Sequence, residues 1–192
     1  MKLKLLIVLL VPFSAFSQLG EVLNFIQKSE YNKEIAEFQA KKYILKNILQ
    51  THDEIVRFEV DALSGAESGQ LTTLYYKCSE QNKEGLLLSF FGTYWNDAGV
   101  VHTGYGFKNF DKKQALEFLQ KIQLAIDNNS KYIKEKSDNN IALHYDDIAI
   151  IITSSSQTAY QIRLFWNSFD SSWDAFSFSR SKRRFDFEIN KK

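Results

Sequence analysis

The sequence predicts an α+β protein dominated by antiparallel β-sheet, with about eight or nine strands in two blocks. Short apolar or alternating segments are joined by short turns, which favours antiparallel neighbours. Apolar residues recur instead at helical spacing in one segment before the first block and in another between the two blocks. The chain has 192 residues, of which 44% are hydrophobic and 24% charged. It is therefore long enough to bury a core without a metal or a disulfide.

The first residues have the pattern of a secretory signal peptide. Lys2 and Lys4 precede an apolar run over residues 5–13, and small residues lead to a cleavage site after Ser17. The run is shorter than the about 20 residues that a membrane-crossing helix needs, so we expect no stable membrane span after cleavage. An anchor that is never cleaved is the alternative. We expect residues 18–192 to form a single α+β domain in the periplasm or outside the cell, and the Lys-led signal and residue usage favour a bacterial source.

The first block follows a helical segment. Residues 19–50 have apolar side chains three and four apart, which predicts one helix interrupted near residues 29–32 or two short helices. The third strand of the block is apolar on both faces and is expected at the centre of the sheet. The predicted strands are residues 55–63, 71–78, 86–95 and 100–107.

A helix is predicted between the blocks, over residues 111–127. Asp111 can accept hydrogen bonds from the first amides of this helix, and Gln114 can reach back as in a capping box. The polar stretch of residues 128–140 ends the helix or frays it. The expected buried stripe is Ala115, Leu116, Leu119, Ile122 and Ile126.

The second block is predicted to hold four or five strands. The last segment, residues 184–189, alternates strictly and indicates an edge strand, with a surface helix as the alternative. Residues 164–170 occupy the place in this block that residues 91–97 occupy in the first, which suggests a duplication or two unrelated blocks of similar composition. The two blocks form one continuous sheet or two packed sheets. The predicted strands are residues 141–145, 148–153, 158–166, 173–179 and 184–189.

Charge and cysteine usage exclude some classes of protein. Without residues 1–17 the chain has 22 basic and 23 acidic residues, so no global field draws it to nucleic acid or anionic lipid as its main partner. Residues 180–192 are locally basic and suit either an acidic partner, lipid headgroups or a solvated tail. The lone Cys78 stands on an apolar strand, which predicts a buried thiol.

The sequence contains little that indicates catalysis. His52, His102 and His144 form no H-x-x-x-H pair or Cys/His cluster, so we expect no metal and no cofactor. Glu59 and Asp61 share one strand face that is best explained as solvated. The glycines on either side of residue 105 do not form a phosphate loop, and we expect them to let the sheet bend or a large ring lie across the backbone.

The aromatic content is the strongest functional indication. Fully 15% of residues are aromatic, and many rings fall on or beside predicted strands. They either fill a core on both faces of the sheet or line a groove for a ligand or partner. The candidate ligand-binding residues are Tyr94, Trp95, His102, Tyr105, Trp166 and Trp173.

These observations predict an exported, non-enzymatic binding or protein-interaction module for an unidentified protein, peptide or saccharide. One alternative is a hydrolase of the cell envelope or of extracellular polymers, with His102, His144 and nearby carboxylates assembled by the fold. The other is an inhibitor or immunity-type protein that blocks a partner with a flat aromatic sheet face.

Overall fold

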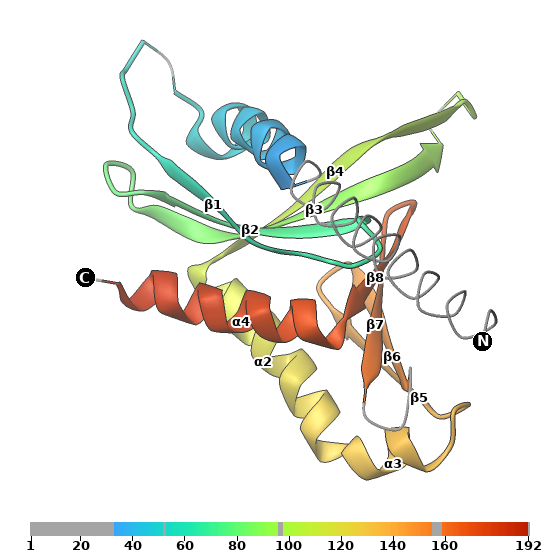
Figure 1. Cartoon of the computed structure of the whole chain (residues 1–192). Coiled ribbons are helices and arrows are strands. Elements are labelled where there is room, and N and C mark those ends of the chain that lie inside the picture. The colour runs from blue at the N-terminus through green and yellow to red at the C-terminus, as the bar shows by residue number, and fades with distance from the viewer. Residues whose placement is uncertain (1–32, 52, 96–97, 155–158, 192) are drawn as a thin grey trace, which may run out of the picture.

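The computed structural model describes residues 33–51, 53–95, 98–154 and 159–191. Eight strands form two four-stranded antiparallel sheets in which each strand pairs with its neighbours in sequence (Figure 1). This confirms the predicted α+β class and its two strand blocks. The predicted signal peptide lies outside the described residues. Among the described residues, no helix is both long enough and apolar enough to cross a membrane.

The N-terminal helical prediction is confirmed for the part that is described. Residues 33–43 are α-helical and run into a π-helical turn, η1 (Ile44–Leu49). This turn ends at Gln50, which has a left-handed backbone with φ of 48°. The helix lies against the outer face of the first sheet (Figure 1).

The first sheet begins later than the sequence predicts. Residues 55–58 are not part of a strand, because the ladder between the first two strands begins only at Glu59, opposite Lys77. Ile55 is accordingly 96% exposed. The strands are β1 (Glu59–Gly65), β2 (Leu71–Cys78), β3 (Lys83–Trp95) and β4 (Val101–Asp111).

Helix α2 (Lys112–Asn128) links the sheets, and the predicted capping box is present. The Asp111 side chain accepts from the Gln114 backbone N–H at 2.8 Å, and the Gln114 side chain accepts from the Asp111 N–H at 3.1 Å. One residue of the predicted buried stripe is wrong: Leu116 is 37% exposed, while Phe118 is fully buried. The polar stretch that follows contains a short further helix, α3 (Ser130–Glu135).

The second sheet has four strands, so the described residues contain eight in all. The predicted loop after the third of these strands is a tight turn at Asn167, whose φ is 51°. The last strand therefore starts earlier than predicted and ends at Asp174. The strands are β5 (Asn140–Tyr145), β6 (Ile148–Ser154), β7 (Tyr160–Trp166) and β8 (Phe169–Asp174).

The C-terminal segment corrects the sequence prediction. Residues 184–189 are not an edge strand; they belong to helix α4 (Ala175–Asn190). The side chains that this helix buries are Ser177, Phe178, Ser181 and Phe185, which follow the helical period. The helical period is not apparent in the sequence, because two of the four buried positions are serines and therefore do not contribute to an apolar stripe.

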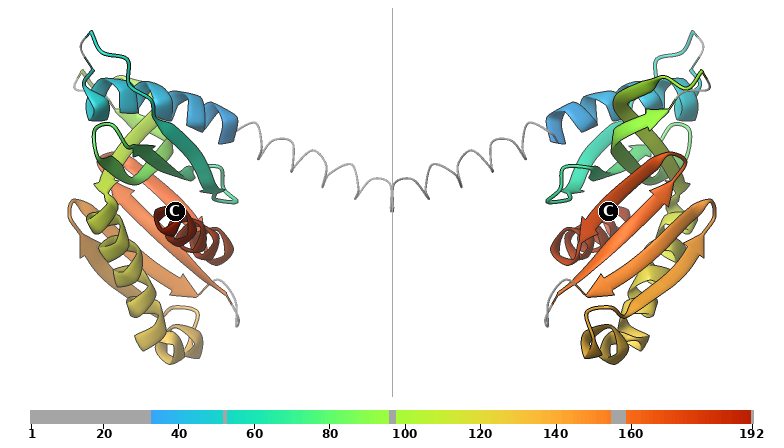
Figure 2. Two further views of the ribbon diagram at one scale, coloured as in Figure 1. Left: turned by 90° about the vertical axis from the view of Figure 1, so that its left-hand side faces the viewer. Right: turned by 90° about the vertical axis from the view of Figure 1, so that its right-hand side faces the viewer.

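Each block is thus a four-stranded meander followed directly by a helix with an aspartate N-cap. Helix α4 does not stay with its own sheet alone, since its most extensive packing is on β1 of the first sheet. Figure 2 shows the two sheets and helices α2 and α4 from the side. A large buried cluster draws side chains from both sheets, α2 and α4, and a smaller one joins the N-terminal helix to the first sheet.

Candidate binding surface

The hairpin formed by β3 and β4 extends beyond the sheet that supports it. Strand β3 has 13 residues and β4 has 11, whereas β2 has 8. Ladder pairing with β2 ends at Phe90, and the Phe91 N–H donates to the Gln70 carbonyl just before β2 at 2.8 Å. From Gly92 onward β3 pairs only with β4. Figure 1 shows this end of the hairpin projecting away from the rest of the first sheet.

One face of this hairpin carries a row of aromatic rings. Phe91 and Tyr105 stand directly opposite each other in the ladder, with ring centroids 4.9 Å apart. Phe107 is two residues from Tyr105 on β4, so its ring lies on the same face, 6.2 Å away and nearly parallel at 14°. Tyr43 of the N-terminal helix stacks on Phe107 at 5.0 Å and closes the row at its inner end. We call Phe91, Tyr105 and Phe107 the hairpin aromatic face.

Hydroxyl groups continue this face toward the hairpin tip. Thr93 and Thr103 are both exposed, and their Oγ1 atoms are 3.5 Å apart. Phe91 is 39% exposed, while Tyr105 and Phe107 are half-buried. The face therefore changes from a covered aromatic end beside the N-terminal helix to an exposed end of mixed rings and hydroxyls.

The outer parts of the two hairpin strands carry no formal charge. Residues 85–95 and 98–107 contain no Asp, Glu, Lys or Arg, although 24% of the whole chain is charged. His102 is the one titratable imidazole in these two segments. A surface of this kind suits an uncharged ligand, because a charged group pressed against it would lose water without gaining an opposite charge.

The opposite face of the hairpin is covered around Gly92 and Gly106 and is exposed farther out, at His102. Phe169 of β8 lies over Gly92 and Gly106, where an added Cβ would meet its ring. This confirms the prediction that glycine here lets a large ring cross the backbone. Tyr94 contacts Phe169 with centroids 5.6 Å apart, and His102 lies 5.9 Å from Tyr94.

The predicted site residues fall into separate places. Tyr94 and the exposed His102 lie on the face opposite the hairpin aromatic face, and Tyr105 lies on the aromatic face. Trp95 is the last residue of β3, and the structure describes its backbone but not its side chain. The remaining two tryptophans lie in the second sheet.

Trp166 and Trp173 serve the packing between the sheets. The indole of Trp166 stacks on Phe90 at 5.2 Å and donates to Asp147 Oδ2 at 2.9 Å. Trp173 is 1% exposed and packs between Phe118 and Phe178. A ring buried to that degree contacts only the protein itself.

The sequence reasoning missed Phe91, Phe107 and Tyr43 as parts of a site. The alternation along β3 places residue 91 on the same side as residue 95, so the face was readable. The strand register, which sets Phe91 opposite Tyr105, could not be read from the sequence.

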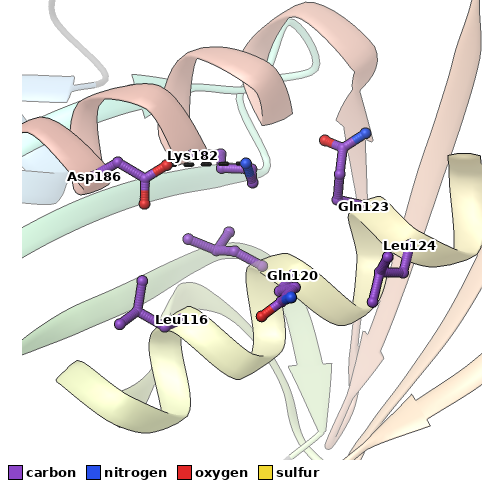
Figure 3. A pocket seen from close by; sticks show the side chains of 7 residues that line it. Leu116, Gln120, Gln123, Leu124, Lys182 and Asp186 are labelled. Atoms are coloured by element: carbon purple, nitrogen blue, oxygen red, sulfur yellow. Dashed lines mark ion pairs between the residues drawn. The ribbon is translucent and has the colours of Figure 1, made fainter.

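A groove between α2 and α4 is a second surface feature (Figure 3). It encloses about 320 Å³, with Leu116, Gln120 and Leu124 on α2 and Lys182 and Asp186 on α4. The two charged groups face each other across 3.9 Å. Because this pair satisfies both charges, the groove offers an apolar floor with no uncompensated group for chemistry.

A polar hollow of about 380 Å³ lies beside β1, with Glu59, Tyr75 and Glu188 in its wall. The Tyr75 hydroxyl donates to Glu84 Oε1 at 2.7 Å. Burial, followed by the Glu84 contact, raises the pKa of Tyr75. Burial also tends to raise the pKa of Glu84, but hydrogen bonds from Tyr75 and Lys112 hold it below its ordinary value. Both shifts move the pKa farther from pH 7, whereas a general acid or base works best with a pKa near pH 7.

The histidines do not assemble a site in the described part of the chain. His102 lies on β4 and His144 on β5, in different sheets, and both are exposed. His52 lies outside the described residues. Over residues 33–51, 53–95, 98–154 and 159–191 there is no group of three or more His, Cys, Asp or Glu that could hold a metal ion.

The fold and its surface thus define a two-sheet α+β protein with a projecting hairpin that carries a row of aromatic rings. Comparison with protein-family models, with curated proteins and with solved structures finds no match to this chain.

Proposed function

We propose that this protein is an exported, non-catalytic binding module, and that the hairpin aromatic face is its ligand surface. The observation that carries the proposal is the row of Phe91, Tyr105 and Phe107 on a hairpin that extends past its supporting strand. Aromatic surface with a few placed polar groups is the usual composition of a ligand site. Export is supported by the Lys-led apolar segment over residues 1–17.

The chemistry of the face favours an uncharged polysaccharide. A sugar ring has apolar C–H faces and a rim of hydroxyls, which matches aromatic rings flanked by the Thr93 and Thr103 hydroxyls. The absence of formal charge on residues 85–95 and 98–107 fits a neutral polymer better than an acidic one. The open row of rings suits an extended chain rather than a small enclosed molecule.

Affinity electrophoresis tests this proposal. The protein is run in native gels that contain hydroxyethylcellulose, glucomannan, galactomannan or dextran, with alginate as a charged polymer. We expect retardation by at least one neutral polymer and none by alginate. Phe91→Ala should weaken that binding by about tenfold or more, because Phe91 is the most exposed ring of the hairpin aromatic face.

Two further variants keep the test sharp. Thr93→Lys adds a charge at an exposed position without touching the core and should also abolish retardation. Tyr132→Ala removes a ring that is 48% exposed on α3 and should bind as wild type does. Mobility unchanged by all four neutral polymers would overturn the saccharide assignment and leave a protein partner as the remaining ligand class for this face. Equal loss in Tyr132→Ala would overturn the assignment of the surface.

A further inference from the structure

Helix α4 presents a second surface, on the side away from the core. Phe176 and Phe187 are 67% and 64% exposed. They are eleven residues apart, so they stand on the same side of the helix to within about 20° and about 16 Å apart along its axis. Two large apolar rings thus point into solvent from one straight ridge.

Basic side chains fill the space between these rings. Arg180 and Arg183 fall on the same side of the helix as the two phenylalanines. The Arg180 guanidinium lies 4.4 Å from the centroid of the Phe176 ring. We call Phe176, Arg180, Arg183 and Phe187 the α4 ridge.

The acidic residues of the helix lie off this ridge. Asp186 turns toward the groove with α2, where it faces Lys182 (Figure 3). Glu188 turns toward the hollow beside β1 and pairs with Lys191 at 3.6 Å. Within the described residues, neither Arg180 nor Arg183 pairs with a carboxylate, so the ridge keeps its positive charge.

The ridge is rigidly mounted. On the opposite side of α4, Ser177 Oγ donates to the Gly65 carbonyl at 2.9 Å, and Phe178 and Phe185 are fully buried. Arg184, beside the ridge, donates to the Leu63 carbonyl at 2.8 Å. The exposed rings are therefore held outward by the fold and are not a loosely packed end of the core.

We infer that the α4 ridge docks on an anionic lipid surface. Aromatic rings that project from a helix can insert into the interfacial region of a lipid bilayer without a matching groove. Arginines on the same side of the helix can then bind the phosphate groups of the lipids. The attraction is local, because the chain as a whole is nearly neutral. This inference concerns a different face from the saccharide surface and does not depend on it.

Vesicle flotation tests the inference. The protein is mixed with vesicles of equal parts phosphatidylcholine and phosphatidylglycerol, or of phosphatidylcholine alone. We expect it to float with the anionic vesicles, at least tenfold more than with the neutral ones, and to be released by high salt. Absence of flotation with anionic vesicles would overturn the inference and point instead to an acidic protein surface as the partner of the ridge.

Matched variants assign the binding to the ridge. Phe176→Ser with Phe187→Ser, and separately Arg180→Gln with Arg183→Gln, should each reduce flotation at least tenfold while leaving the urea midpoint unchanged. Phe38→Ser removes a ring that is also 67% exposed, on the N-terminal helix, and Lys131→Gln with Lys134→Gln removes two charges on α3. These two controls should float as wild type does. Wild-type flotation of either ridge variant would overturn the inference.

Discussion

The ring of Phe169, the first residue of β8, lies across Gly106 of β4 where the two sheets meet. The contact joins segments that are far apart in sequence, and it also involves Phe90 and Tyr94 of β3. It fixes the covered face of the hairpin on the second sheet. The other face, with Phe91, is thereby turned outward.

Replacing Gly106 should therefore destabilise the protein. A Cβ at this position would overlap the Phe169 ring, so we expect Gly106→Ala to lower the free energy of unfolding by about 1–3 kcal/mol. Gly104→Ala is the matched control, since its Cβ would meet only Tyr94 at an ordinary 3.5 Å. Urea unfolding of the two variants checks the difference. Equal stability would show that Phe169 does not occupy the space over Gly106.

Asp174 should hold two elements together. It caps α4 by accepting from the Ser177 N–H at 2.8 Å, and its other oxygen accepts from the Glu67 N–H in the β1–β2 turn at 3.0 Å. We expect Asp174→Ala to cost about 1–2 kcal/mol, as loss of a helix cap does, and Asp174→Asn to cost less because the amide oxygen still caps. Thermal unfolding measures both. An alanine variant as stable as the asparagine variant would argue against the cap.

Trp173 should affect stability and not ligand binding. Its ring is 1% exposed between Phe118 and Phe178, so Trp173→Ala should lose about 3–5 kcal/mol through the cavity it leaves. Trp173→Phe, which leaves a smaller void, should fold and retain wild-type retardation by any polysaccharide that binds. Loss of that retardation in a folded Trp173→Phe protein would place the ligand elsewhere than on the hairpin aromatic face.

Asp147 should contribute to the acid sensitivity of folding. Partial burial raises its pKa, but hydrogen bonds from Lys108 and Trp166 outweigh burial and hold that pKa below its ordinary value. Because the pKa of Asp147 is lower in the folded state, ionised Asp147 stabilises the fold at pH values above its unfolded-state pKa of about 4. This stabilisation is lost as the pH falls through the folded-state pKa.

Urea midpoints measured from pH 6 down to acid check this prediction. The decline at low pH should be shallower in Asp147→Asn and in Lys108→Met than in wild type. Identical declines in all three proteins would remove Asp147 from the acid response.

The fold was predictable where local signals and burial agree. Asp111 and Gln114 marked the start of α2, because capping chemistry depends on residues three apart. The strand prediction for residues 184–189 was wrong because Phe185, Phe187 and Ile189 alternate as in a strand. The helix instead buries Ser181, one turn before Phe185. Only the packing of α4 on β1 makes that serine a core residue.

The candidate site was predictable only in part. Tyr105 lies on the aromatic face, but Tyr94 and His102 are on the other side of the same hairpin. Which side faces solvent depends on where Phe169 packs, a contact between distant segments that local spacing does not encode.

The most direct test of the central claim is a titration followed by nuclear magnetic resonance. Protein with isotope-labelled Phe and Tyr rings is titrated with fragments of the neutral polysaccharide that retards it most. The account predicts shift changes concentrated on the rings of Phe91, Tyr105 and Phe107, with Phe118 and Phe178 in the core unaffected. Shifts centred on rings outside the hairpin, or no shifts with any neutral fragment, would contradict it.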